Sequence, residues 1–234
     1  MYGSLVGAER DLIRLMRAAA ADQTAVAAQL LATSPDLALD RLGRDEEFFL
    51  AEGHAQLYAG DSALHAAAFS YHRQLARQLV GMGADVRARN RRGAQPLHAS
   101  VMGVPGSGNW NPQRQCDLIA YLIEAGADPN AAAAGGVTPL HRAVRNRCSD
   151  AVRVLLAAGA DPYLTNDNGS TAFDLAQWTT GRGGSGTPQA KAEQQEIIRL
   201  LAAGLDTSVY VSAPVFPSDA VLGCAIVIET WLMF

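Results

Sequence analysis

Three histidines recur at regular positions in this sequence and are the first candidates for chemistry. His65, His98 and His141 each follow a leucine, and they are separated by 33 and 43 residues. An imidazole is a general base or a metal ligand near neutral pH. A catalytic histidine, however, is not expected once in every structural unit at one fixed position. The spacing therefore favours a structural role for all three rings.

The other chemical patterns are incomplete. Gly181 and Gly186 have the spacing of a phosphate-binding loop, but Thr187 stands where the lysine is required. Cys148 lies near Arg145 and Arg147, which could lower its pKa, but an inert thiol is the simpler interpretation. The sequence thus predicts no catalytic residue, no metal site and no cofactor.

Composition narrows the class of protein. The chain has 234 residues, 49% of them apolar and only 6% aromatic, which favours closely packed helices rich in small residues. Its net charge is −4, so no overall basic field points to nucleic acid. Three cysteines without a C-x-x-C pair indicate a reducing compartment, and we expect a cytoplasmic protein. The first residues lack the apolar run of a signal peptide, and no stretch is long enough to predict a membrane span.

A repeated unit organises most of the chain. Gly60, Gly93, Gly136 and Gly169 open successive units and are spaced by 33, 43 and 33 residues. The tripeptide GAD recurs at positions 83, 126 and 159 with spacings of 43 and 33. Several markers that agree on one period indicate an array in which one copy carries ten extra residues.

Each unit is predicted to contain two helices. In the copy that begins at Gly136, Thr138 can cap the first helix and Pro139 suits its first position. Val152 and Leu155 belong to the apolar face of a second helix, and Gly159 can end that helix in the left-handed conformation.

These residues resemble the ankyrin repeat, over about residues 60 to 204. The resemblance implies an all-α solenoid of stacked helix-turn-helix units with hairpin-like loops. It also implies that the histidine of each unit bonds the capping residue and the neighbouring loop backbone. We predict a degenerate capping repeat at 8–40, an extended insertion at 41–59, repeats at 60–92, 93–135, 136–168 and 169–204, and an apolar tail at 205–234.

Some copies depart from the pattern. Gln95 replaces the capping threonine, and Asp174 replaces the histidine of the last copy. Two insertions, at 103–115 and 179–191, are expected as loops between the two helices of their units. The tail is open to three interpretations: a strand pair on the last repeat, a contact for association, or a poorly ordered segment.

Partner binding is the leading functional hypothesis. Ankyrin proteins typically bind other proteins through loop tips and exposed positions of the first helices, and residues 87–92 contain four arginines. We expect an acidic peptide or protein patch as the partner, because arginine pairs well with carboxylates. The predicted contact residues are Phe69, Arg91, Arg92, Trp110, Arg142, Arg145, Asn146 and Trp178.

Two other functions remain open at this point. One is an enzyme or small-ligand-binding protein with its site under the loops that contain Trp110 and Gly181–Gly186. The other is a secreted, host-directed ankyrin effector. We expect a non-enzymatic monomer that binds neither nucleic acid nor membrane, with association through the tail as an alternative.

Overall fold

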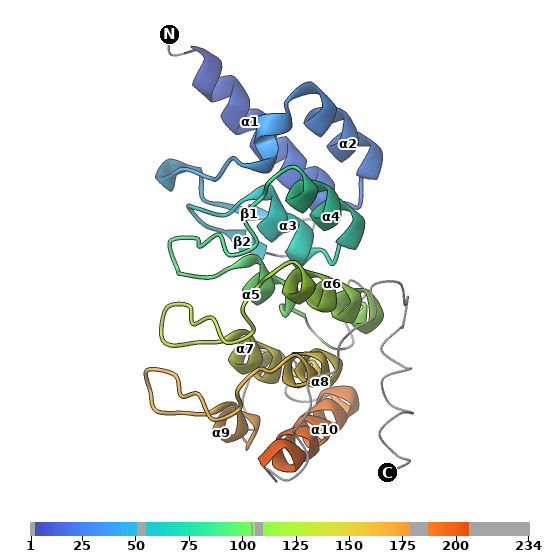
Figure 1. Ribbon diagram of the computed structural model, residues 1–234, viewed down its shortest axis with the longest axis vertical. Coiled ribbons are helices and arrows are strands. Elements are labelled where there is room, and N and C mark those ends of the chain that lie inside the picture. Colours follow the sequence, from blue (N-terminus) through green and yellow to red (C-terminus); the bar gives the residue numbers. More distant parts are fainter. Residues whose placement is uncertain (1–2, 51–54, 104, 106–109, 178–186, 206–234) are drawn as a thin grey trace.

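Helix pairs stack along the long axis of the molecule in the computed structural model (Figure 1). The structure describes residues 3–50, 55–103, 105, 110–177 and 187–205. It is 57% helical and contains one two-stranded sheet within the described residues. The expectation of an all-α solenoid of stacked helix pairs is therefore confirmed.

The elements follow the predicted order of paired helices. The first pair is α1 (Gly3–Ala20) and α2 (Thr24–Thr33), followed by the short helices η1 (Pro35–Ala38) and η2 (Arg44–Glu46) and by the antiparallel strands β1 (Phe48–Leu50) and β2 (Ala55–Leu57). The remaining pairs are α3 (Ala63–Phe69) with α4 (Arg73–Gly81), α5 (Pro96–Ser100) with α6 (Pro112–Glu124), α7 (Pro139–Asn146) with α8 (Ser149–Ala157), and α9 (Ala172–Gln177) with α10 (Pro188–Leu205).

Local signals set the ends of these helices. The Thr138 hydroxyl accepts a hydrogen bond from the His141 amide at 3.3 Å, and Pro139 is the first residue of α7. Gly159 follows the last turn of α8 with a φ of +87°, in the left-handed region. Both assignments made from the sequence are confirmed.

Two helices begin earlier than the sequence pattern predicted. Residues 112–115 and 188–191 were assigned to insertions, but they form the first turns of α6 and α10. The Asn111 side chain accepts from the Arg114 amide at 3.0 Å, and the Thr187 hydroxyl accepts from the Ala190 amide at 3.1 Å. In each case a capping residue directly precedes a proline, which favours a helix start.

Equivalent leucines form the core of the stack. Leu64, Leu97 and Leu140 lie at the same position of the inner helices α3, α5 and α7, and each is at most 1% exposed. The outer helices contribute Leu79, Leu122 and Leu155, which are fully buried and have the spacing of the repeat. Burial of these side chains between successive units provides much of the free energy that holds the array together.

The loops between units form a second row of contacts. The Arg91 amide donates to the Ala59 carbonyl at 2.7 Å, and the Ala134 amide donates to the Arg92 carbonyl at 2.8 Å. Gly136 has a φ of +67°, and a Cβ atom there would lie 2.9 Å from the backbone nitrogen of Asp167. Only glycine allows the loops to approach so closely at that point.

The described residues of the segment 41–59 pack against the array through strands β1 and β2. The Gly60 amide donates to the Leu42 carbonyl at 2.8 Å, and Leu50 of β1 is fully buried. Phe49, which faces away from that core, is 59% exposed. The hairpin therefore forms one wall of a groove beside the inner helices.

Candidate partner-binding groove

The periodic histidines lie inside the stack, where each connects one unit to the next. His98 is fully buried, its Nδ1 accepts from the Gln95 amide at 3.2 Å, and its Nε2 lies 3.1 Å from the Val137 carbonyl. Because Nδ1 accepts a hydrogen bond, the proton must be on Nε2, which donates to the carbonyl of the following unit. The ring is therefore neutral and its bonding capacity is used.

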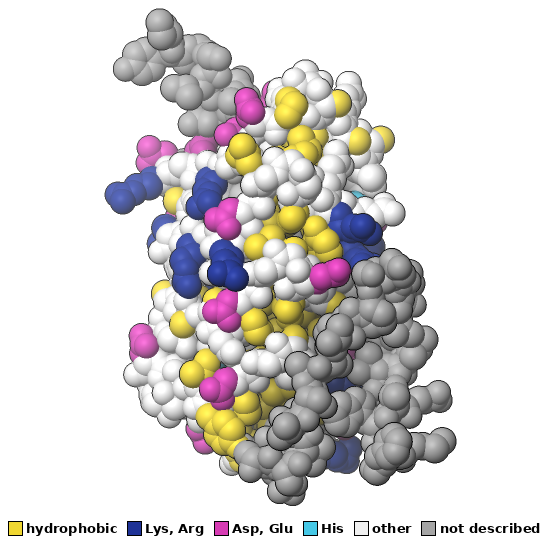
Figure 2. Space-filling view, in the orientation of Figure 1, with side chains coloured by type: hydrophobic (Ala, Val, Ile, Leu, Met, Phe, Trp, Pro, Cys, Tyr) yellow, Lys and Arg dark blue, Asp and Glu magenta, His cyan; other side chains and the backbone are white. Residues whose placement is uncertain are grey.

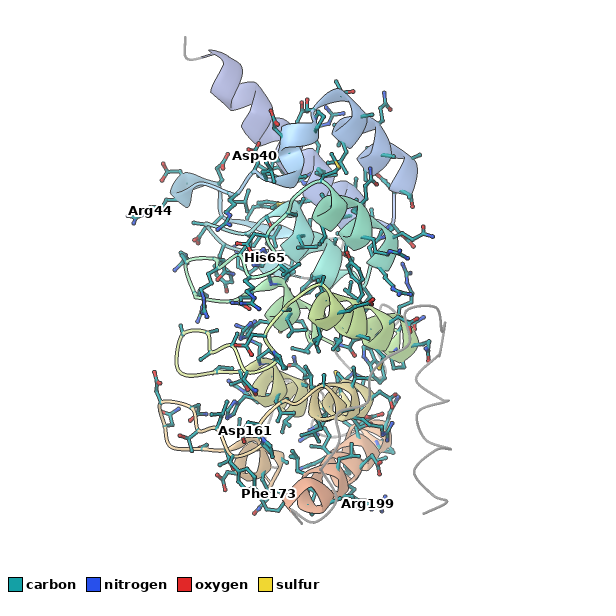
Figure 3. The ribbon with its side chains drawn as sticks, in the orientation of Figure 1. Asp40, Arg44, His65, Asp161, Phe173 and Arg199 are labelled. Carbon is teal, nitrogen blue, oxygen red and sulfur yellow. The ribbon has the colours of Figure 1, made fainter. Side chains whose placement is uncertain are left out.

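His65 and His141 repeat this arrangement. Their Nε2 atoms lie 3.2 Å from the Ala94 carbonyl and 3.1 Å from the Ser170 carbonyl, respectively. Burial lowers the pKa of each ring and lowers that of His98 to about 3. Figure 3 shows His65 inside the stack, whereas Arg44 projects from its edge. The structural interpretation of the three histidines agrees with these contacts.

The last unit replaces the imidazole with a carboxylate. Asp174 accepts hydrogen bonds from the Thr171 amide at 2.8 Å and from the Thr171 hydroxyl at 2.7 Å. These bonds lower the pKa of Asp174. The carboxylate thus makes the local contact that Nδ1 makes elsewhere.

A groove of about 690 Å³ runs along the inner helices and the adjacent loops. It extends from the β1–β2 hairpin to α9 and α10. Its lining combines apolar side chains with four arginines and one acidic residue, Asp61. Phe69, Arg92, Arg142, Arg145 and Asn146 of the predicted contact set line it.

Tyr58, directly after strand β2, places its aromatic ring near Arg91 and near Arg92, which lines the groove. The guanidinium groups of Arg91 and Arg92 lie 5.1 and 5.2 Å from the centroid of the Tyr58 ring. Arg92 also donates to the Tyr58 hydroxyl at 3.3 Å. Tyr58 lies outside the repeat pattern and is not among the predicted contact residues.

Arg142 is a partly buried cation in the middle of this surface. It donates to the His98 carbonyl at 3.3 Å. Burial and the nearby charge of Arg92 lower its pKa. Among the described residues no carboxylate lies within ion-pair distance of Arg142, because Asp61 bonds Asn90 and the Tyr58 amide instead.

Arg145 and Asn146 continue the surface by one turn of α7. Arg145 is exposed, and it forms no ion pair with any residue that the structure describes. Asn146 donates to the Val101 carbonyl at 3.1 Å, so part of its hydrogen-bonding capacity is used within the array. Phe69 is partly buried against the core and offers an apolar edge to the groove.

Two of the predicted contact residues, Arg91 and Trp110, are not among the residues that line the groove. Arg91 forms an ion pair with Glu47, with Nη2 to Oε2 at 2.8 Å. Trp110 packs against the core, and its indole N–H donates to Gln115 at 3.1 Å. Trp178 lies outside the described residues, as does the loop from Gly181 to Gly186.

The four arginines at 87–92 are largely used within the structure. Arg87 donates to the Gly126 carbonyl at 2.6 Å, and Arg89 donates to the Ala132 carbonyl at 2.6 Å, both in the following loop. Along the loop edge of the array, basic side chains lie among acidic ones (Figure 2). The run of arginines is therefore not a continuous free patch.

The described part of the chain offers little support for a reactive thiol, a metal site or a membrane-spanning helix. Cys148 is fully buried, and burial raises its pKa to about 12, which disfavours the reactive thiolate. No group of three or more histidine, cysteine or acidic side chains is arranged to bind a metal there. Of the helices described, none has the length and apolar character that crossing a bilayer requires.

Comparisons with known proteins agree with this architecture. A family model described as "Ankyrin repeats (many copies)" matches residues 122–176, and one described as "Ankyrin repeat" matches residues 59–91.

Curated relatives match over part of their length. Ankyrin repeat and SOCS box protein 16 of Mus musculus is 39% identical over 114 residues, which are 48% of this chain and 24% of that protein. NF-kappa-B inhibitor alpha of Homo sapiens is 32% identical over 127 residues, 50% of this chain and 37% of that protein. The 2-5A-dependent ribonuclease of Homo sapiens is 49% identical over 61 residues, 26% of this chain and 8% of the enzyme. This chain thus matches well under two thirds of each of these relatives.

Ankyrin repeats are protein–protein interaction modules and are generally non-enzymatic. The stacked units, the histidines that join them and the two family matches together show that this chain contains ankyrin repeats.

Proposed function

We propose that the groove binds an acidic segment of a partner protein. The observation that carries this proposal is the cationic cluster of Arg92, Arg142 and Arg145, which lies among apolar side chains. Arg142 and Arg145 have no carboxylate within ion-pair distance among the described residues, and the nearby charges of Arg92 and Arg145 both lower the pKa of Arg142. A carboxylate from a partner would relieve this repulsion and accept two parallel hydrogen bonds.

The neighbouring side chains define the rest of the ligand. Phe69, Met102 and Val144 line the groove beside the arginines, and Tyr58 closes one side. Apolar anchors usually supply more affinity than charges at the rim, whereas charges raise association rate and specificity. The partner segment should therefore combine an acidic residue with apolar residues on either side.

Within this proposal the protein acts by binding and has no catalytic role. The polar groups near Trp110 are used in local bonds, since Gln115 accepts from the indole and donates to the Ser100 carbonyl at 2.9 Å. We further propose a reducing compartment such as the cytoplasm, because Cys148 is a buried free thiol.

Panning a library of short random peptides against the full chain tests the groove directly. The wild type should enrich peptides that contain acidic and apolar residues. The variant Arg142→Glu with Arg145→Glu should lose that enrichment, because the repulsive charges are placed where the ligand carboxylate binds.

A matched control changes the same charge elsewhere. Arg14→Glu with Arg199→Glu alters two exposed arginines outside the groove, with side chains 63% and 74% exposed. This control should enrich the same peptides as the wild type. If the groove variant also enriches them, the proposed binding face is wrong.

A further inference from the structure

The cationic cluster of the groove has no carboxylate within ion-pair distance of Arg142 or Arg145 among the described residues, and only the charge of Asp61 acts on Arg142 from further away. Arg142 is partly buried, and Arg145 is exposed one turn further along α7. The one acidic residue of the lining, Asp61, already accepts from Asn90 at 2.9 Å and from the Tyr58 amide at 2.7 Å. The cluster is therefore a site for carboxylates that come from outside the described residues.

Residues 206–234 of the same chain have the chemistry that this surface requires. This segment contains Asp206, Asp219 and Glu229 and has no lysine, arginine or histidine. Apolar residues surround its acids, with Val215 and Phe216 before Asp219 and the run 225–228 before Glu229. It is the stretch of this chain that combines acidic with apolar residues and carries no positive charge.

The position of residues 206–234 in the chain also allows them to reach the cationic cluster of the groove. It follows α10 directly, and Gln194 and Ile197 of α10 line one end of the groove. Packed helices are separated by ~8–10 Å, so the cluster on α7 is on the order of 20–30 Å from that end. The 14 residues from Asp206 to Asp219 can span ~45 Å when extended, which is sufficient.

We propose that residues 206–234 bind in the groove of their own chain, with acidic side chains on Arg142 and Arg145 and apolar side chains against Phe69, Met102 and Val144. The segment then competes with external partners for the same surface. Because it is covalently attached, its effective concentration is high, and a partner must displace it. The proposal uses the groove of the proposed function but does not require that an external partner be known.

A spin label on the segment tests this arrangement in the full chain. Cys116 and Cys148 are at most 1% exposed, so a thiol-reactive nitroxide should label Cys224 in the folded protein. Amide resonances of Ala99 and Asn146 in the groove should lose most of their intensity. The amide of Thr33, at the end of α2, should keep its intensity and serves as the internal reference.

Charge variants show whether the proposed contact causes the broadening. Asp219→Asn with Glu229→Gln, and separately Arg142→Gln with Arg145→Gln, should restore the groove resonances in the labelled chain. An unchanged amide spectrum of each unlabelled variant, apart from the substituted positions, shows that the array remains folded. Broadening that is absent from the groove, or that persists in both double variants, would overturn the proposal.

A mixed sample separates binding within one chain from binding between two copies. Isotope-labelled chains without the nitroxide are combined with unlabelled chains that carry it. Groove broadening in this mixture means that a second copy supplies the segment, and the proposal of binding within one chain is then wrong.

Peptide enrichment distinguishes this inference from the proposed function. The variant with neutral tail acids should bind the enriched acidic peptides several-fold more tightly than the wild type. If peptides bind the groove but the spin label leaves it unaffected, only this inference fails. If the label broadens the groove while no peptide is enriched even by the tail variant, only the function toward partners fails.

Discussion

Two sets of polar side chains in this protein differ in how fully their bonding capacity is used. The histidines His65, His98 and His141 are buried, and both ring nitrogens of each have a partner. The arginines Arg142 and Arg145 are closer to solvent, and among the described residues neither has a carboxylate partner. Repetition along a sequence therefore indicates structure in the first set, whereas the unused charge of the second set is the basis of the proposed binding role.

The arginines also differ from one another in whether their guanidinium groups already have partners within the array. Arg87 and Arg89 bond the carbonyl groups of the following loop, and Arg91 pairs with Glu47. They stand in the densest run of arginines in the sequence, yet their guanidinium groups mainly connect parts of the array. Most of the charge proposed for a ligand lies where the sequence is less basic, on α7, and of the arginines at 87–92 only Arg92 lines the groove.

The largest expected effect is a loss of stability as the pH falls. The pKa of each periodic histidine is lowered by burial, that of His98 to about 3. Below the unfolded pKa of about 6.5, the unfolded chain therefore binds more protons than the folded one, and stability falls by up to about 1.4 kcal/mol per pH unit for each ring. Urea titrations between pH 7.5 and pH 5 should show this decline, which for His98 continues toward pH 3.

The control for this decline is the same titration of His98→Gln, which removes one proton-binding site. Its stability should depend less steeply on pH than that of the wild type. Equal slopes would mean that His98 is not held neutral in the folded protein.

His98→Ala should have the next largest effect. It leaves the Gln95 amide and the Val137 carbonyl without the ring that joins them, in a fully buried position. Buried polar groups that lose a partner cost ~1–3 kcal/mol each, so we expect a loss of about 2–4 kcal/mol in the free energy of unfolding. Chemical denaturation measures this, with Arg145→Ala as the comparison from the second set. Similar losses in both variants would contradict the distinction between the two sets.

Two glycine-to-alanine variants should produce smaller changes in stability that test the backbone conformation of the array. Gly159 has a φ of +87° and Gly81 lies at the end of α4 without a positive φ, and a Cβ meets nothing within 4 Å at either site. Alanine at position 159 should cost ~1 kcal/mol from left-handed strain, whereas alanine at position 81 should stabilise by about 0.5–1 kcal/mol. Thermal unfolding of both variants gives the signs, and a stabilised Gly159→Ala variant would remove the assigned role of this residue.

The sequence was sufficient for features that each unit specifies locally. The period of 33 residues, Thr138 as a helix cap and Gly159 as a helix end depend on neighbouring residues, and the structure contains all three. The early starts of α6 and α10 could also have been found, because Asn111 and Thr187 each precede a proline. The glycine-rich residues before each of these signals favour a loop in the sequence pattern and obscure the helix start.

Contacts between segments that are far apart in the sequence could not be predicted from local residue patterns. Tyr58 reaches Arg92 from a hairpin outside the repeat, and Glu47 pairs with an arginine 44 positions away. Nothing in the local sequence shows which arginines find carbonyl or carboxylate partners after folding. The groove was therefore predicted in part, through Arg142 and Arg145, while its hairpin wall was missed.

The smallest expected change in stability, and the sharpest test of the contrast, comes from two arginine-to-glutamine variants. Arg145→Gln removes a charge that has no described partner, so the free energy of unfolding should stay within about 0.5 kcal/mol of the wild type. Its affinity for the enriched acidic peptides should fall, and the remaining binding should depend less on salt, because one rim charge is lost.

Arg89→Gln should show the reverse pattern, since Arg89 donates to the Gly93 carbonyl at 3.0 Å and to the Ala132 carbonyl at 2.6 Å. Loss of those bonds should lower the free energy of unfolding by about 0.5–1.5 kcal/mol and leave peptide affinity almost unchanged. Calorimetric melting and peptide titration on the same samples provide both quantities. If both variants change affinity equally, the loop arginines contribute to binding after all, and the division between arginines that connect the array and arginines that face the ligand is wrong.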